Sequence, residues 1–236
     1  MLSRKTKIIA TIGPSSVDKN IIKAMISEGM DVIRINSAYG DIKQYQEIIN
    51  NLSEVDVNNK VKKLLDIKGL EILKFCETTE FDFIAISFTE TQDQVLKVKG
   101  ILPKSFVISK IESVEGVRNY IKILEVSDGI MIARGDLGKA TSIEKVPPLQ
   151  KKFTKIALDN NKFVIAATEM LLSMTTNIVP TNAEVSDVAN AVFDGVHAVM
   201  LSEETAIGKY PVESVAFMRR AVEEAEKWCT TNECTV

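Results

Sequence analysis

The segments FVISKIE (106–112) and DGIMIARGD (128–136) decide the fold. Each begins as a short run of apolar residues rich in Val and Ile, and a helical pattern over 114–126 lies between them. Strands of a parallel sheet are covered on both faces, so they tend to be apolar along their whole length instead of alternating. The stretch therefore predicts a β-α-β unit with two parallel strands.

The same unit recurs along the whole chain. An apolar run precedes each of eight helical patterns, over 19–30, 44–52, 70–78, 92–102, 114–126, 149–160, 182–193 and 211–228. Eight consecutive units in 236 residues predict a single closed (β/α)8 TIM barrel spanning 1–236, for which about 250 residues is typical. An open doubly wound sheet is the alternative. No GxGxxG follows the first apolar run, which argues against the dinucleotide-binding form of that sheet.

The composition fits one domain with a sizeable core, because 45% of the residues are hydrophobic. A net charge of −3 lacks the basic footprint of a nucleic-acid-binding protein. No apolar run reaches about 18 residues, so we expect no membrane span, and the first residues lack the apolar core of a signal peptide. We expect a cytoplasmic protein with reduced cysteines, although Cys229 and Cys234 could pair under oxidation.

Both deciding segments end in charge, which is costly in a buried strand unless the charges are paired or bind a metal. Lys110 and Glu112 are two residues apart, so on a strand both side chains point to the same face. Together with Asp136 from a neighbouring strand end, they could hold a divalent metal and an anionic substrate. A structural ion network at the barrel rim is the alternative interpretation.

Other polar residues gather at the same end of the predicted strands, where TIM-barrel enzymes carry their active sites. They are Arg34, Asn36, Asp66, Lys68, Ser87, Arg134, Thr168, Glu169, Ser202, Glu203 and Glu204. Several cations around a few carboxylates suit a phosphorylated or carboxylated substrate bound through a metal. The single histidine, His197, falls at the start of the last predicted strand, and we interpret it as structural. A histidine-based triad or zinc site is therefore disfavoured.

Nine segments of the chain, between Arg4 and about Lys227, resemble the pyruvate kinase family and occur in the same order as in that family. The matching segments are RKTKIIATIGPSS, GMDVIRIN, LLDIKG, DFIAISF, ISKIE, VSDGIMIARGDLG, ATEML, PTNAEVSDVANAVFDG and AVMLSEETAIGKYPVE. The resemblance implies a barrel domain that transfers a phosphoryl group between phosphoenolpyruvate and ADP, using Mg²⁺ or Mn²⁺ and usually K⁺.

The resemblance also implies a role for each matching position. Glu112 and Asp136 match divalent-metal ligands, and Lys110 matches the lysine that stabilises the enolate. Arg34 matches the arginine that holds the phosphate, and Thr168 matches the threonine near the reacting carbon. The resemblance further implies substrate contacts at Ser87, Ala133, Arg134, Gly135, Asp136 and Thr168, and monovalent-cation ligands at Asn36 and Asp66.

The chain departs from the family on the nucleotide side. Between 66 and 81, where the family carries a lid domain, only one helix fits, and we expect no carboxy-terminal domain after the eighth helix. Ala38 takes the place of a hydroxyl ligand, which leaves K⁺ dependence open. The other departures are Ile67 for a threonine, Leu73 for an arginine, Glu169 for a glutamine and Glu203 for a glycine.

Three functions stay open from the sequence. The first is a minimal pyruvate kinase acting on phosphoenolpyruvate or pyruvate. The second is a Mg²⁺- or Mn²⁺-dependent lyase, aldolase or mutase that acts on a 2-oxo acid without nucleotide, and the third is a non-catalytic metabolite-binding barrel. Lys110, Glu112 and Asp136 are all present, which favours an enzyme. We expect a small-molecule substrate and no nucleic-acid or membrane partner, while use of ADP or ATP, a homo-oligomer and a partner-supplied lid stay open.

Overall fold

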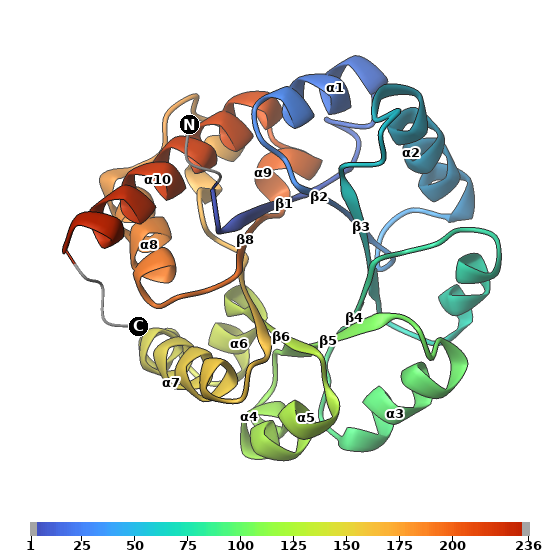
Figure 1. Ribbon diagram of the computed structural model, residues 1–236, viewed down its shortest axis with the longest axis vertical. Helices are drawn as coiled ribbons and strands as arrows, with labels where there is room; N and C mark the ends of the chain where they lie inside the picture. Colours follow the sequence, from blue (N-terminus) through green and yellow to red (C-terminus); the bar gives the residue numbers. More distant parts are fainter. Residues whose placement is uncertain (1–3, 233–236) are drawn as a thin grey trace.

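Eight parallel strands close into a barrel in the computed structural model, which describes residues 4–232. Each strand pairs with the next, and β8 closes the ring against β1, for example through Ile9 and Met200 (Figure 1). The strands are β1 Lys7–Thr11, β2 Val32–Asn36, β3 Lys62–Ile67, β4 Phe83–Ile86, β5 Phe106–Ile111, β6 Gly129–Ala133, β7 Phe163–Ala167 and β8 Ala198–Leu201. The predicted TIM barrel is confirmed.

Helices form a ring around the strands (Figure 1). They are α1 Lys19–Ser27, α2 Ile42–Val55, α3 Gln92–Ile101, α4 Val114–Arg118, α5 Tyr120–Val126, α6 Arg134–Ala140, α7 Val146–Asp159, α8 Asn182–Phe193, α9 Glu203–Ala206 and α10 Pro211–Asn232, with 3-10 turns η1 Glu71–Glu77, η2 Ile143–Lys145 and η3 Leu172–Thr175. Their starts follow ordinary capping chemistry. Thr181 and Glu184 form a capping box at α8, and prolines occupy the first turn of α7.

The structure corrects several predicted elements. The helix expected over 114–126 is broken at Asn119 into α4 and α5. The helix expected over 70–78 is a 3-10 turn, and between β6 and α7 the chain forms α6 and η2, which were not among the eight predicted helices. Cys76 is free, but Cys229 is disulfide-bonded, so the expectation of reduced thiols is wrong there. Cys234 lies outside the described residues.

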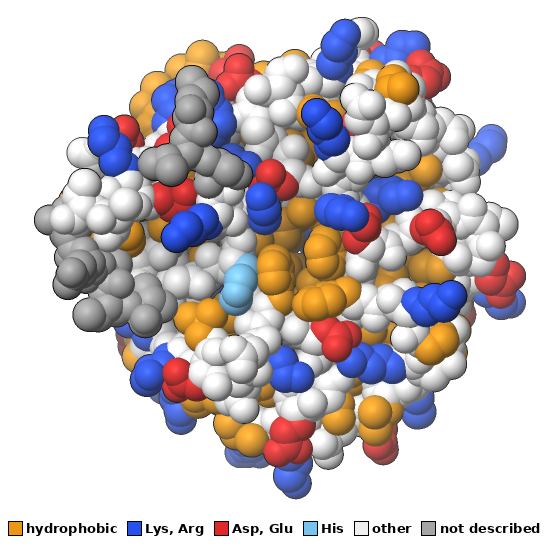
Figure 2. Space-filling model, viewed as in Figure 1, with side chains coloured by type: hydrophobic (Ala, Val, Ile, Leu, Met, Phe, Trp, Pro, Cys, Tyr) orange, Lys and Arg blue, Asp and Glu red, His pale blue; other side chains and the backbone are white. Residues whose placement is uncertain are grey.

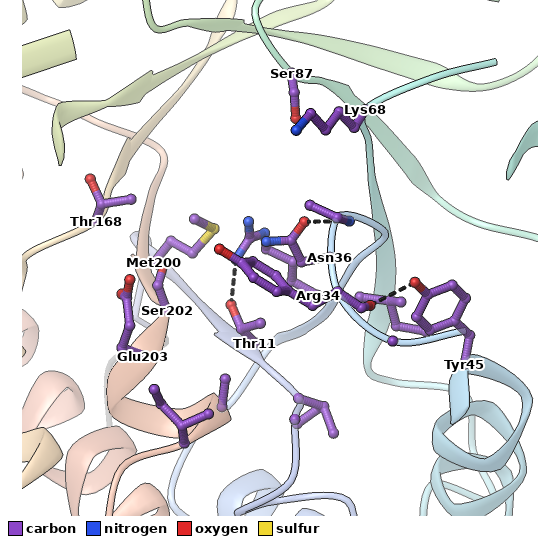
Figure 3. A pocket seen from close by; sticks show the side chains of 18 of the residues that line it. Thr11, Arg34, Asn36, Tyr45, Lys68, Ser87, Thr168, Met200, Ser202 and Glu203 are labelled. Atoms are coloured by element: carbon purple, nitrogen blue, oxygen red, sulfur yellow. Dashed lines mark hydrogen bonds between the residues drawn. The ribbon is translucent and has the colours of Figure 1, made fainter. Parts of the chain in front are cut away.

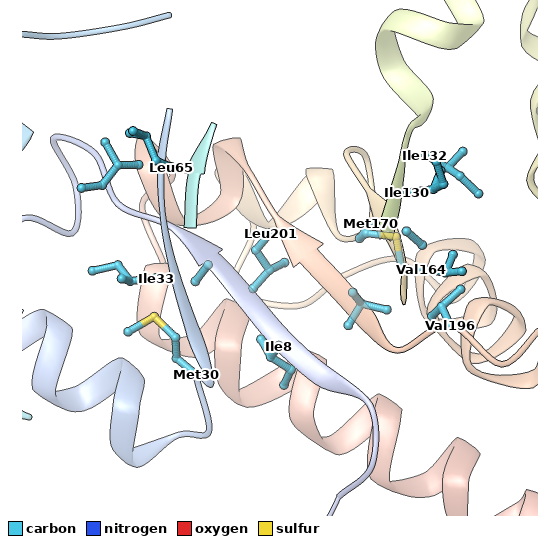
Figure 4. Close-up of a cluster of buried hydrophobic side chains, with 14 of the residues drawn as sticks. Ile8, Met30, Ile33, Leu65, Ile130, Ile132, Val164, Met170, Val196 and Leu201 are labelled. Carbon is cyan, nitrogen blue, oxygen red and sulfur yellow. The ribbon is translucent and has the colours of Figure 1, made fainter. Parts of the chain in front are cut away.

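Two layers of apolar side chains make the core. The outer layer packs the strands against the helices, and Figure 4 shows part of it, including Ile8, Ile33 and Leu201. The inner layer fills the barrel with Ile9, Val32, Leu64, Ala85, Ile108, Met131, Ile165, Ala167, Ala198 and Met200. Because side chains alternate along a strand, Arg34, Asp66 and Lys110 lie on the same inner face as the apolar residues two positions before them.

The amino-terminal end of the barrel is plugged by aromatic rings. Phe83, Phe106 and Phe163 pack with ring centroids 5.6 to 6.1 Å apart. Figure 2 shows an apolar group at the centre of this face, with the histidine beside it. His197 stacks on Phe163, and its Nδ1 accepts a hydrogen bond from the Val164 amide. Burial lowers the pKa of His197, which fits the structural role predicted for it.

No helix in the described part of the chain combines the length and apolarity that crossing a bilayer requires.

Candidate active site

A cavity of about 1050 Å³ opens at the carboxyl end of the barrel strands. It brings together side chains that are far apart in the sequence, including Arg34, Ser87 and Thr168 (Figure 3). Most of the predicted site residues line it: Arg34, Asn36, Ser87, Lys110, Glu112, Ala133, Asp136 and Thr168. Chemistry at this end of the barrel is what the fold predicts.

Asp66 is the centre of a buried ion network beneath this cavity. Its carboxylate is fully buried and accepts hydrogen bonds from Arg34 Nε at 3.0 Å, Arg34 Nη2 at 2.7 Å and Ser87 Oγ at 2.9 Å. Lys110 Nζ lies 2.9 Å from Asp66 Oδ2. Burial opposes ionisation of Asp66, but Lys110 and Arg34 outweigh it and lower the pKa of this carboxyl group. Thr11 completes the network by accepting from Arg34 Nη1 at 2.8 Å.

Lys110 lies between two carboxylates, because its Nζ is also 3.0 Å from Glu112 Oε1. The other oxygen of Glu112 accepts the Phe88 amide at 2.7 Å. Glu112 is 2% exposed. Burial raises its pKa, and the favourable contacts with Lys110 and the Phe88 amide do not cancel that effect. The negative charge of Glu112 is thus only partly compensated, so a cation added beside it would be stabilised.

Asp136 reaches the cavity from the first turn of α6, directly after β6. Its side chain is 43% exposed, and its Oδ1 accepts from Lys139 Nζ at 3.1 Å. Lys139 is itself mostly exposed, so this pair is weak and easily displaced. The described residues contain no cluster of three or more acidic, histidine or cysteine ligands. Glu112 and Asp136 both line the cavity, and carboxylate oxygens are the protein ligands that suit Mg²⁺, which usually keeps several waters.

Two of the predicted substrate ligands point elsewhere. Arg134 and Gly135 do not line the large cavity but a smaller one of about 420 Å³ on the other side of α6. Arg134 donates to the carbonyl of Thr168 and to Asp187, and the Gly135 amide donates to Thr168 Oγ1 at 2.8 Å. These donors are therefore used within the protein and do not face the cavity.

Comparison with known proteins shows the family to which the chain belongs. A family model described as "Pyruvate kinase, barrel domain" matches residues 3–75 and 68–215. The chain belongs to the pyruvate kinase family.

Curated relatives named pyruvate kinase extend the match. The protein of Thermococcus litoralis is 35% identical over 335 residues, covering 96% of this chain and 70% of the relative. That of Chlamydia muridarum is 41% identical, covering 91% of this chain and 45% of the relative, and that of Methylorubrum extorquens is 47% identical, covering 62% and 31%. The chain thus spans less than half the length of the last two relatives.

The match also locates the main difference from these pyruvate kinases. The Thermococcus alignment runs over 335 residues although this chain has 236, so the relative carries residues within the matched region that this chain lacks. The family model matches in two pieces that meet at 68–75. In the structure this segment lies between β3 and β4, where η1 is the only element and Leu73 is buried.

The pyruvate kinase resemblance also implies a monovalent-cation site at Asn36 and Asp66, and the arrangement does not fit one. The charge of Asp66 is already compensated by two side-chain cations. Asn36 Oδ1 accepts from the Ala38 amide, and Ala38 itself offers no side-chain ligand. We therefore assign no monovalent cation to this structure.

Sequence reasoning missed two groups at the cavity. The Phe88 amide holds Glu112, and Thr11 holds Arg34. Lys68, expected just past the end of the third strand, adds an exposed cation to the cavity wall. A backbone amide carries no sequence signal, but Thr11 ends the first strand, so the rule that located Arg34 could have found it.

Proposed function

We propose that this barrel forms or uses a pyruvate enolate, as a pyruvate-kinase-like enzyme without a lid. The observation that carries the proposal is the position of Lys110 Nζ, 3.0 Å from Glu112 and 2.9 Å from Asp66 in a cavity that Asp136 also lines. A fixed ammonium beside a divalent-cation site is suited to the negative charge that develops on an enolate oxygen.

Each residue has a distinct task in this proposal. Glu112 and Asp136 hold Mg²⁺ or Mn²⁺, which when bound polarises the substrate oxygens. Lys110 faces the developing enolate oxygen, and its two carboxylate partners, Asp66 and Glu112, fix the position of its Nζ. Arg34, buried and held by Asp66, presents its remaining N–H groups to a substrate phosphate. Thr168 Oγ1 lies at the opposite wall of the cavity (Figure 3).

Reaction without nucleotide is the second candidate, and the short connection between β3 and β4 favours it. With only a 3-10 turn there, no domain inserted at this point can close over a bound triphosphate or exclude water from phosphoryl transfer. Exchange of the methyl protons of pyruvate, or decarboxylation of oxaloacetate, requires only the metal site, Lys110 and a proton carrier. We therefore propose that these partial reactions are retained and that transfer to ADP is slow.

Proton NMR of pyruvate in D₂O tests the enolate. With Mg²⁺ or Mn²⁺, deuterium should enter the methyl group at a rate that depends on the protein. A parallel assay supplies phosphoenolpyruvate, ADP and metal. Rapid ADP-dependent formation of pyruvate would identify a lidless kinase, whereas no exchange, no decarboxylation and no transfer would contradict the proposed function.

Calorimetry with Mn²⁺ tests the metal ligands separately from turnover. Glu112→Gln and Asp136→Asn should each weaken Mn²⁺ binding about tenfold or more, because each removes one of two charged oxygen ligands. Glu115→Gln is the matched control, since Glu115 is a half-exposed carboxylate on α4 that pairs with Arg118. Unchanged Mn²⁺ binding in both cavity variants would remove Glu112 and Asp136 from the metal site.

A further inference from the structure

The chain turns sharply after β7 through two consecutive residues in the left-handed region. Thr168 has φ +67° and Glu169 has φ +54°. Such angles are uncommon for non-glycine residues, and for a β-branched threonine they mark a real outlier. Strained backbone of this kind persists only where surrounding contacts hold it. The contacts that hold this corner are therefore informative about function.

Arg134 supplies the main contact. Its Nε and Nη2 donate to the carbonyl oxygen of Thr168 at 3.1 and 2.7 Å. Nη2 also lies 2.8 Å from Met170 Sδ, and Nη1 donates to Asp187 Oδ2 on α8 at 2.5 Å. The Arg134 side chain is only 8% exposed. A planar guanidinium places two donors on one carbonyl, which a lysine ammonium cannot reproduce in the same geometry.

The turn at Thr168 and Glu169 is also hydrogen-bonded to α6, the helix that carries Asp136. The Gly135 amide donates to Thr168 Oγ1 at 2.8 Å, and that hydroxyl donates to the Ala167 carbonyl at 2.6 Å. Arg134 and Gly135 begin α6, and Asp136 follows them directly. The buried Arg134 side chain and the Gly135 amide thus link the start of α6 to Thr168 at the end of β7.

We propose that Arg134 is a positioning residue that holds Thr168 in its strained conformation, and that it does not bind substrate. Through the Thr168 carbonyl it fixes where the Thr168 hydroxyl lies in the cavity, and through Asp187 it is itself anchored to α8. The predicted effect of replacing Arg134 on turnover rests on the proposed function. The predicted effect on the backbone conformation at Thr168 does not.

Arg134→Lys and Arg134→Met test this role with two readouts. In pyruvate methyl exchange, both variants should lower kcat about tenfold to a hundredfold and leave KM nearly unchanged, because the bound substrate is retained while Thr168 is displaced. In NMR hydrogen exchange, the Gly135 amide should be protected in the parent protein. It should exchange faster in both variants, because its acceptor, Thr168 Oγ1, moves.

The variant Glu169→Gly, made in the Arg134→Lys background, is the sharper test. Glu169→Gly adopts the left-handed conformation without strain, so in the Arg134→Lys background it should restore part of kcat and part of the Gly135 protection. Glu169→Ala is the matched control, because it removes the same carboxylate without this freedom and should restore neither.

Other results would overturn the assignment. A rise in KM at constant kcat would show that Arg134 is a substrate ligand. If Arg134→Lys keeps the kcat and the Gly135 amide protection of the parent protein, only the positive charge at position 134 matters, and the guanidinium geometry does not. Should the Arg134 variants fail to fold, Asp187→Asn loosens the anchor alone. It should change the Gly135 protection in the same direction, and unchanged protection would refute the role. If the parent protein exchanges no methyl protons, the proposed function fails, and the amide measurement still decides the role of Arg134.

Discussion

The two sides of the cavity are built in different ways. The ionic wall consists of Arg34, Ser87, Lys110 and Glu112 together with Asp66 buried directly beneath them, and these residues come from the ends of β2 to β5 or directly follow them. The corner wall consists of Asp136, Thr168 and Glu203, which all follow their strands and lie on α6, on the turn after β7 or on α9. Asp66 is fully buried, whereas the Asp136 side chain is 43% exposed.

Because the two walls are built differently, we expect them to contribute differently to the function of the site. On the ionic wall, strand geometry and mutual charge fix every side chain before a ligand arrives, which is the preorganisation that stabilises developing charge. On the corner wall, backbone turns and short helices place the groups, and their charges stay in contact with water. Changes to the ionic wall should therefore affect chemistry and stability together. Changes to the exposed charges of the corner wall should mainly affect which ligand binds.

Lys110→Met should produce the largest effect, because it removes the centre of the ionic wall. We expect kcat for methyl exchange to fall by about a thousandfold, since the charge that meets the enolate is lost. Stability should also fall by about 3 kcal/mol, because Glu112 is left buried with only an amide donor. Methyl-exchange NMR and urea denaturation measure the two losses.

Lys62→Met is the control for Lys110→Met. Lys62 begins β3 at the opposite end of the barrel, and its exposed side chain pairs with Asp82. It should change activity little and stability by at most about 1 kcal/mol. If Lys110→Met is destabilised but each folded molecule keeps full activity, Lys110 is a structural ion-pair partner, the alternative that the sequence left open.

The contrast between the walls also explains what could be predicted from the sequence. Along a strand, side chains alternate, so the position of Arg34, Asp66 and Lys110 inside the barrel follows from the apolar residues two positions earlier. Lys110 and Glu112 were predicted to share a face, and they form an ion pair.

Past the last residue of a strand, alternation no longer applies, and prediction fails for physical reasons. Arg134 follows β6 directly but begins a helix, so its side chain turns away from the cavity that the sequence assigned to it. The left-handed turn at Thr168 depends on contacts with α6 and α8, which are remote in sequence. The Phe88 amide that holds Glu112 is a backbone group, and its role depends on a loop conformation with φ +48°.

Asp66→Asn should give the next largest effect, and this effect should depend on pH. Lys110 and Arg34 outweigh burial and hold the pKa of Asp66 below its usual 3.8. The folded state therefore binds fewer protons, so the stability from ionised Asp66 is present above about pH 4 and is lost as pH falls through the lowered pKa. The parent protein should exceed the variant by about 3 kcal/mol at neutral pH. Denaturation measured at a series of pH values should show that this difference in free energy of unfolding disappears only in strong acid.

Asp159→Asn is the control for Asp66→Asn, because Asp159 forms an exposed i,i+4 pair with Lys155 on α7. The parent protein and Asp159→Asn should differ in free energy of unfolding by less than about 0.5 kcal/mol at every pH. A gap for Asp66→Asn that is equally small, or that does not change with pH, would mean that the ionic wall is not held together by this carboxylate.

Glu203 should give the smallest effect, and it tests the corner wall. This exposed carboxylate lines the cavity where the pyruvate kinase resemblance implies a glycine. Its charge opposes the approach of an anionic nucleotide, so Glu203→Gln should strengthen ADP binding by about threefold at low salt. The gain should disappear in concentrated NaCl, because salt screens charges that face water. Calorimetry with Mg²⁺ and ADP at two salt concentrations measures it.

Comparison with Glu203→Gly separates charge from bulk at this position. If charge is the cause, both variants should bind ADP equally well at low salt and lose the gain together as salt is added. If the gain appears only with glycine and persists in salt, the side chain obstructs the nucleotide sterically and the electrostatic account is wrong. If neither variant binds ADP better, Glu203 does not limit nucleotide binding, and the missing contacts must be those between β3 and β4. Lys110→Met provides the internal contrast, since its loss of kcat should persist in concentrated NaCl because Lys110 is buried.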